Sequence, residues 1–147
     1  MYKRILIATD GSRLSRKAIL HGTALAQALG ATVVGFHARQ PFPAIYFAEA
    51  VMVPPSTEKQ FEADSAKLAK ERLAEVEAAA KKAGVNYRSV QITDRSPAEA
   101  IIRAAKKEKC DLIVMASHGR KGFARVLIGS ETSLVLTHST IPVLVTR

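Results

Sequence analysis

The chain of 147 residues contains a single cysteine, Cys110, and no tryptophan. One thiol forms neither an intramolecular disulfide nor a cysteine-based zinc cluster, and the four histidines are not paired at metal-ligand spacing. No apolar run is long enough to span a membrane, and the apolar stretch before Thr9 is too short for a signal-peptide core. We therefore expect a cytoplasmic protein with no intrinsic metal and no membrane association.

Acidic residues are few, with 13 Asp and Glu against 22 Lys and Arg and a net charge of +9. Counted along the sequence, residues 1–40 carry six cations and one anion, residues 41–95 eight of each, residues 96–115 four against three, and residues 116–147 four against one. A basic surplus is one mark of nucleic-acid binding. However, aromatics are only 5% of the chain and no DNA- or RNA-binding motif is present, so nucleic acid is not the expected partner.

Motifs of familiar enzyme classes are also missing. The sequence contains no G-x-x-x-x-G-K-S/T loop, no G-x-G-x-x-G and no G-x-S-x-G. Cys110, between a charged stretch and an apolar one, is interpreted as a small buried hydrophobe rather than a nucleophile. With no identifiable general base or nucleophile, we expect a binding protein with no catalytic residues and at most slow nucleotide hydrolysis.

The sequence does contain short apolar runs typical of strands, which alternate with segments whose apolar residues recur at helical spacing. The predicted strands cover residues 5–8, 31–38, 85–92, 111–117 and 141–145, and the predicted helices cover residues 14–28, 56–83, 97–109 and 130–138. Gly30 is a C-terminal stop for the first helix, and Ser96 with Glu99 forms a capping box. Strands 111–117 and 141–145 are continuous apolar runs, typical of strands covered on both faces.

Strict alternation of strands and helices predicts an all-parallel sheet, because parallel neighbours need a crossover connection. We expect one doubly wound, Rossmann-like α/β domain over residues 1–147, with five parallel strands and helices on both faces. The length suits a single hydrophobic core.

Two segments between the second and third strands differ in character. Residues 40–55 hold four prolines and a single charge, which predicts a long loop without a regular helix. It either packs over the domain or serves as a lid or partner surface. In the following helix, the predicted apolar face consists of Phe61, Leu68, Leu73 and Val76.

Ligands of open α/β sheets bind beyond the carboxyl ends of the strands, where the connections diverge. This rule selects two turns, ATDGSRLSRK (residues 8–17) and ASHGRKGFARVLIGSE (residues 116–131). In the second turn, Gly119 and Gly122 leave backbone N–H groups uncovered, and Gly129-Ser130 opens a helix whose first N–H groups favour an anion. Ser130 either donates its hydroxyl to a phosphate or caps the helix.

The second turn resembles the nucleotide-binding signature of the universal stress protein family, G-x2-G-x9-G-S/T. Gly119 is followed by nine residues and then Gly129-Ser130, whereas Ala116 stands where the pattern has its first glycine. Further similarities are IATDGS near the start, GFHA, SPAEAI, DLIVMASHGR and the final HSTIPVLV. The resemblance covers the whole chain.

That resemblance implies an adenine-nucleotide site, with ATP and magnesium as the expected ligand. Asp10 would meet the nucleotide, with Mg²⁺ held through the nucleotide near it, and His37 or Ala38 would border the adenine. Met115 and Ala116 would lie beside the ribose. The full set of implied site residues is Ala8, Asp10, Ala38, Met115, Ala116, Gly119, Gly129, Ser130, Glu131 and Thr132. Arg120, Lys121 and Arg125 are candidate phosphate contacts, with solvated surface charge as the alternative, and His118 is either a ligand contact or a structural residue.

Family members also commonly dimerise through their last strand. The resemblance thus implies a homodimer through residues 141–146, where an uncovered edge strand would be a liability. The implied function is stress-response regulation by a nucleotide-binding dimer. The alternative is a dimeric protein-interaction module that binds no nucleotide.

Overall fold

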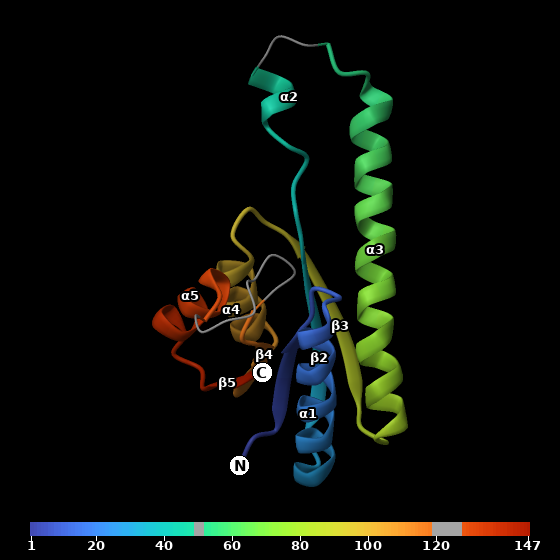
Figure 1. The fold of residues 1–147 in the computed structure, drawn as a ribbon. Helices are drawn as coiled ribbons and strands as arrows, with labels where there is room; N and C mark the ends of the chain where they lie inside the picture. Colours follow the sequence, from blue (N-terminus) through green and yellow to red (C-terminus); the bar gives the residue numbers. More distant parts are fainter. Residues whose placement is uncertain (49–51, 119–127) are drawn as a thin grey trace.

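A computed structural model of the chain describes residues 1–48, 52–118 and 128–147. Five parallel strands form one sheet in the order β3-β2-β1-β4-β5 (Figure 1). Their bounds are β1 Arg4–Ala8, β2 Thr32–Arg39, β3 Tyr87–Thr93, β4 Leu112–Ala116 and β5 Val143–Thr146. The predicted α/β fold with a five-stranded parallel sheet is therefore confirmed.

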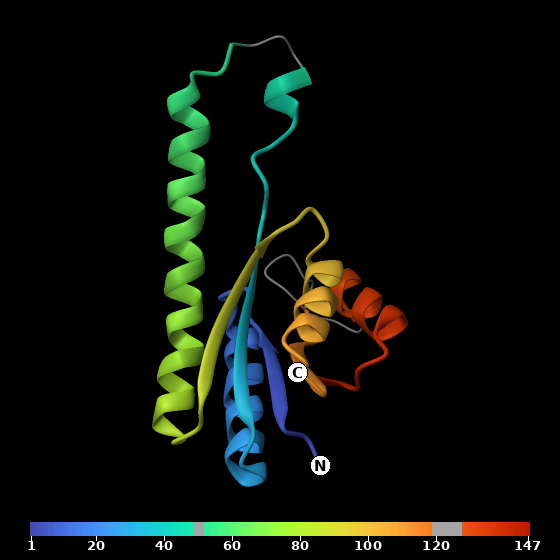
Figure 2. The same ribbon diagram turned by 180° about the vertical axis from the view of Figure 1, so that it is seen from behind.

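Helices cover both faces of this sheet. One face carries α1 (Arg13–Leu29) and α3 (Pro55–Lys82), and the other carries α4 (Pro97–Lys107) and α5 (Ser130–His138). Figure 2 shows α4 and α5 together on their side of the sheet. Ser96 caps α4 by accepting a hydrogen bond from the Glu99 backbone N–H at 3.3 Å, as predicted. The other half of the predicted capping box is replaced, because the Ser96 N–H donates to Asp94 Oδ1 at 2.9 Å.

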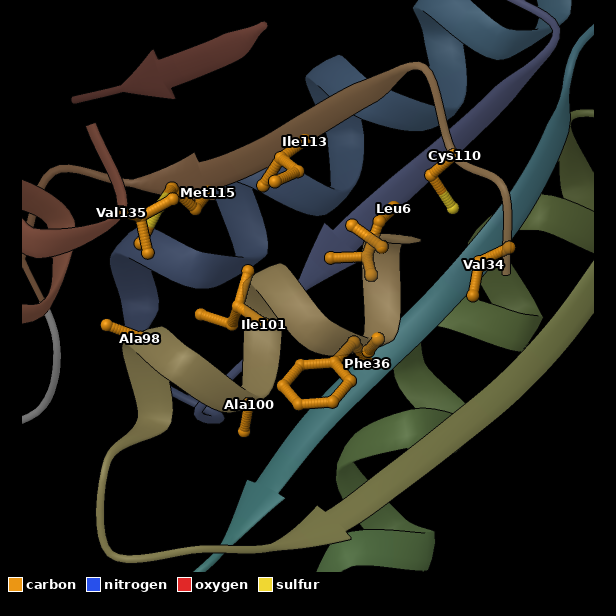
Figure 3. Close-up of a cluster of buried hydrophobic side chains, with 12 residues drawn as sticks. Leu6, Val34, Phe36, Ala98, Ala100, Ile101, Cys110, Ile113, Met115 and Val135 are labelled. Carbon is orange, nitrogen blue, oxygen red and sulfur yellow. The ribbon is translucent and has the colours of Figure 1, made fainter. Parts of the chain in front are cut away.

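Alternate residues of each central strand belong to different cores. Leu6 and Phe36 face α4 and α5, where they pack with Ile101, Met115 and Val135 (Figure 3). Ile5 and Ile7, on either side of Leu6, and Val33 of β2 face α1 and α3. Because every second side chain of a strand points to the same face, continuous apolar runs such as ILI supply both cores at once.

The proline-rich segment departs from its prediction, because a single helical turn, α2 (Ile45–Ala48), forms within it. α2 lies between Pro43 and Pro54, so neither ring interrupts its backbone hydrogen bonds. Figure 1 shows α2 and the first half of α3 standing beyond the end of the sheet. The aromatic ring of Phe42 packs against Tyr46 and Phe61, with ring centroids 5.2 and 5.3 Å apart.

The apolar face predicted for α3 is partly wrong. Leu73 and Val76 are buried together with Ala69 and Ala80, but Leu68 is 42% exposed. The four buried residues all lie in the second half of α3, the half that packs on the sheet. In the first half of α3, Phe61 is half-buried against Phe42, whereas Leu68 has no such neighbour in the core and stays exposed.

β5 is an edge strand, as expected for residues 141–146, but it is not covered on both faces as predicted. Among the described strands it pairs with β4 alone. Val143 packs against the α4-side core, whereas Leu144 is 39% exposed on the opposite face. The composition of a fully buried strand and of an edge strand can thus be the same.

Gly22 lets α1 approach the sheet closely. A Cβ at this position would lie 2.6 Å from Cδ1 of Ile7, inside the contact distance of carbon atoms. Ile7 is fully buried and has little room to move. The absence of a side chain on this helix residue therefore sets the distance between α1 and β1.

We predict that Gly22→Val lowers the free energy of unfolding by about 2 kcal/mol, because overpacking a dense core costs this order of energy. Ala24→Val on the exposed side of α1 is the control, since it changes only helix propensity by a few tenths of a kcal/mol. Urea unfolding monitored by circular dichroism measures both variants. Equal destabilisation of the two would contradict the close approach.

Candidate functional site

A cavity of about 570 Å³ opens at the carboxyl ends of β1, β2 and β4. It lies where the strand order reverses, because β1 pairs with β2 on one side and with β4 on the other. Nine of the ten predicted site residues line it, namely Ala8, Asp10, Ala38, Met115, Ala116, Gly129, Ser130, Glu131 and Thr132. The tenth, Gly119, lies outside the described residues, as do Arg120, Lys121 and Arg125.

The turn between β1 and α1 is fixed by short-range hydrogen bonds. The Asp10 carboxylate accepts the Ser12 backbone N–H at 2.9 Å, and the Ser12 hydroxyl caps α1 by accepting the Ser15 N–H at 3.1 Å. Gly11 adopts φ +77°, a left-handed conformation that favours glycine. Asp10 therefore closes the turn as an Asx residue while it also faces the cavity.

His37 is buried beneath this turn and is held at both ring nitrogens. Nδ1 lies 2.8 Å from the Thr9 carbonyl oxygen, and Nε2 lies 3.2 Å from Nη1 of Arg72. Because a carbonyl oxygen only accepts, Nδ1 carries the proton and Nε2 accepts from the guanidinium. Burial lowers the pKa of His37, and Arg72 and Arg39 lower it further, against the carbonyl of Thr9 and the charge of Asp10.

Arg72 is a cavity residue that the sequence interpretation missed. Arg72 belongs to α3, a helix that the sequence marks only by its apolar face and balanced charge. A signal was nevertheless present, since Arg72 lies one turn from Ala69 and Val76 on the buried side of the helix. Other cavity residues that were not anticipated are Thr9, Ser15, Phe36, Gln40, Arg95, Pro97 and Ile101.

The start of α5 is another wall of the cavity. Gly129 is the N-cap, with φ −58° and ψ 152°, and no side chain of the described residues caps the helix. Ser130 is the first helical residue, so the alternative that it caps the helix is wrong. The first turn, which carries the positive end of the helix dipole, lines the cavity through Ser130, Glu131 and Thr132.

Two neighbouring side chains tie α5 to the rest of the site. The Thr132 hydroxyl donates to the carbonyl oxygen of Ala116 at 2.9 Å, and the Glu131 carboxylate accepts the Ala98 N–H at 2.8 Å. Glu131 thereby binds the N-terminal turn of α4, whose dipole favours an anion. Both residues line the cavity, yet these bonds give them a structural task in holding α4, β4 and α5 together.

The structure also places His118 and Cys110, two further residues considered from the sequence. His118 lies at the cavity, with its Nδ1 3.0 Å from the Ser117 hydroxyl. Cys110 is buried, and burial raises the pKa of its thiol to about 11, which keeps it protonated at neutral pH. Among residues 1–48, 52–118 and 128–147, no cluster of three His, Cys, Asp or Glu side chains could hold a metal ion.

The whole sequence, residues 1–147, matches the Universal stress protein family. A universal stress protein of Thermus aquaticus, named for its place in the QAH/OAS sulfhydrylase 3' region, is 35% identical over the full length of both chains. The chain belongs to the universal stress protein family. This confirms the resemblance drawn from the motifs, although Ala116 departs from the nucleotide-binding signature.

Solved structures of universal stress proteins share the fold. MJ0577 of Methanocaldococcus jannaschii superposes with a TM-score of 0.83 at 27% identity, covering 99% of this chain and 96% of that one. A universal stress protein in complex with cAMP gives a TM-score of 0.73 at 24% identity, covering 99% and 97%. One from Archaeoglobus fulgidus in complex with dAMP gives 0.71 at 18%, covering 99% and 98%.

No helix in the described part of this universal stress protein is both long and apolar enough to cross a membrane.

The lowered pKa of His37 predicts how stability depends on pH. The unfolded chain takes up a proton near pH 6.5, whereas the folded protein resists it, so the free energy of unfolding falls as the pH drops below 6.5. His37→Gln should lose less stability between pH 7 and pH 5 than the wild type. Urea unfolding at both pH values measures this difference, and equal losses in the two proteins would refute it.

Proposed function

We propose that this universal stress protein binds an adenine nucleotide, with ATP as the physiological ligand, in the cavity between β1, β2 and β4. The observation that carries the proposal is that the predicted site residues, which come from four separate segments of the chain, line one cavity. This cavity lies where the strand order of the sheet reverses. Relatives of the same fold bind cAMP and dAMP, which supports an adenine nucleotide as the ligand.

The cavity offers different chemistry along its length. Phe36 and Ala38 of β2, Met115 of β4 and Ile101 of α4 present apolar surface, which suits the faces of a purine ring. Asp10 contributes a carboxylate beside them. A flat aromatic base with polar edges fits such a mixed lining better than a sugar or a peptide.

The α5 end of the cavity suits phosphate. Gly129 brings no side chain to the N-cap, the first-turn N–H groups are not taken by a capping side chain, and Ser130 adds a hydroxyl. Backbone N–H groups and the helix dipole together favour a phosphate group. Gly119 belongs to the same proposal through the family motif, and Arg120 and Lys121 belong to it through their charge. Mg²⁺ would arrive with the nucleotide, near Asp10.

Ala116 occupies the position of the first motif glycine. It is almost buried, and its carbonyl oxygen already accepts from Thr132, so the strand end is well defined. Its methyl group is the smallest side chain that could replace the glycine hydrogen. We therefore propose that Ala116 borders the ribose and that binding persists, with affinity equal to or lower than that of a glycine-containing site.

Assembly belongs to the same proposal. The hydrogen bonds from Ile113 N–H to Pro142 O and from Ser117 N–H to Thr146 O place even-numbered residues of β5 against β4. In a parallel pair the odd-numbered residues then turn their N–H and C=O groups to the open edge. Pairing this edge within residues 141–146 with the same strand of a second copy would satisfy these groups by two-fold symmetry.

A regulatory function follows from nucleotide binding together with dimerisation. Nucleotide in the cavity would change the surface that the dimer presents to a partner protein in the stress response. The chain's own groups supply binding and orientation, and no general base is identified at the cavity. The protein would thus act as a nucleotide-dependent switch in the cytoplasm.

The first test is a calorimetric titration of nucleotide-free protein with Mg-ATP at physiological salt. We expect saturable binding of about one ATP per chain. Gly129→Leu should abolish it without unfolding the protein, because the side chain would block the helix N-terminus, whereas Ala28→Leu on the exposed side of α1 should bind normally. Absence of heat with the wild type would favour the alternative function, a dimeric interaction module that binds no nucleotide.

The second test addresses the dimer. Val145→Pro removes an outward-facing N–H from β5 without touching a hydrogen bond to β4, so it should convert the dimer to a monomer. Val145→Thr keeps the N–H and should remain dimeric. Sedimentation equilibrium at micromolar concentration gives the masses. A monomeric wild type, or a dimeric proline variant, would contradict pairing through β5.

A further inference from the structure

A second hollow, of about 330 Å³, lies between α4 and α5, the two helices that Figure 2 shows side by side. Among the described residues, it shares no lining residue with the cavity at the ends of the strands. We call it the α4–α5 groove and define it by Glu99, Ile102 and Lys106 of α4 and by Leu134 and His138 of α5. Four of these five side chains are exposed, so the groove opens to solvent.

The two helices run in the same direction along the groove. The Ala98 N–H in the first turn of α4 donates to the Glu131 carboxylate in the first turn of α5 at 2.8 Å. Lys106 and His138 belong to the last turns of the same helices and line the other end of the groove. At 1.5 Å per residue, the distance along α4 from Ala98 to Lys106 is about 12 Å, which is about two turns of a partner helix.

The apolar surface of the groove comes from Ile102 and Leu134. Ile102 is half-buried against the core on this side of the sheet, whereas Leu134 is 41% exposed. A single exposed leucine is ordinary on a protein surface. Two apolar side chains in a hollow between helices, however, form the kind of surface that receives the apolar face of an amphipathic helix.

The charge of the groove changes sign along its length. Glu99 lies in the first turn of α4, whereas Lys106 lies at the far end, followed in sequence by Lys107 and Lys109. These three lysines are exposed, and no described residue forms an ion pair with them. The carboxylate of Glu108, between them in sequence, is only 13% exposed and pairs with two arginines instead. The lysine end therefore attracts an acidic partner.

These charges also fix the direction of a helix in the groove. Arg103, midway along it, is already paired with Asp94 at 2.6 Å and leaves the gradient from Glu99 to Lys106 unchanged. The acidic residues of the bound helix would lie against Lys106. Acidic side chains are most favourable in the first turns of a helix, so this end would be its N-terminus. The bound helix would then run antiparallel to α4 and α5, which brings unlike ends of the helix dipoles together.

We propose that the α4–α5 groove binds an amphipathic helix of a partner protein, with its apolar face on Ile102 and Leu134 and its acidic N-terminal half against Lys106. The inference does not depend on nucleotide binding, and its test uses nucleotide-free protein. An anionic membrane surface and a second copy of this chain are the competing occupants, and the test separates them from a partner helix.

The test is fluorescence anisotropy with a labelled synthetic peptide of about fifteen residues. The peptide carries leucines at helical spacing on one face, glutamates in its first two turns and lysines in its last two. We expect saturable binding of about one peptide per chain in the micromolar range. A second peptide with lysines in place of the glutamates should bind about tenfold more weakly, because like charges would meet at Lys106.

Each helix offers a matched pair of variants. Lys106 lines the groove and exposed Lys107 does not, so Lys106→Glu should weaken binding of the acidic peptide about tenfold and Lys107→Glu should change it little. Leu134 and Leu136 are 41% and 42% exposed, but of the two only Leu134 lines the groove. Leu134→Ser should therefore weaken binding by about tenfold or more, whereas Leu136→Ser should bind like the wild type.

The direction of the bound peptide is measured with a nitroxide label at its N-terminus. The label should broaden the NMR signals of Lys106 and His138 more than the signal of Glu99. Strongest broadening at Glu99 would overturn the antiparallel arrangement.

Several results would overturn the inference, and none of them depends on whether the protein binds ATP. They are no binding of the acidic peptide, equal affinity for the two peptides, and equal losses in both members of either pair of variants. A lower mass of Leu134→Ser than of the wild type in sedimentation would make the groove an interface between copies. Binding of phosphatidylglycerol vesicles that is lost in Lys106→Glu would assign it to a membrane surface.

Discussion

β1 forms hydrogen bonds along both of its edges, and this double pairing organises the molecule. β2 pairs with one side of β1 and β4 pairs with the other, and all three strands are parallel. The connections that follow these strands therefore begin at the same end of the sheet. Helices on opposite faces then draw the connections apart and open the cavity between them. Residues distant in sequence, such as Asp10 and Ser130, meet because parallel strands place their carboxyl ends together.

Several contacts around the cavity serve both the fold and the site. Asp10 closes a turn, Thr132 holds the end of β4 and Glu131 binds the first turn of α4, yet all three line the cavity. Their geometry is therefore set before any ligand arrives, which lowers the entropic cost of binding. His37 has a comparable role from a buried position, because its neutral ring joins the β1 turn to α3.

Local patterns predicted the elements well because β1 and β4 are short apolar runs and because helices such as α1 and α4 begin at a capping serine. The errors occurred where neighbouring elements decide the outcome. Leu68 is exposed because α3 extends past the sheet, and Leu144 is exposed although β5 has the composition of a strand covered on both faces. Ser130 is not a cap, because Gly129 takes that position in the backbone. Sequence periodicity records which residues are apolar, but not what lies opposite them.

The sequence by itself determined the alternation of strands and helices, the parallel sheet that this requires, and the family, since motifs such as IATDGS and DLIVMASHGR are local features. Tertiary structure alone decided that Arg72 and Arg95 reach the cavity. Arg72 is one of many charges on a long helix, and only the packing of α3 against the end of β2 brings it to His37. The physical reason is that hydrogen bonding along the chain acts over a few residues, whereas the lining of a site is set by how whole elements pack.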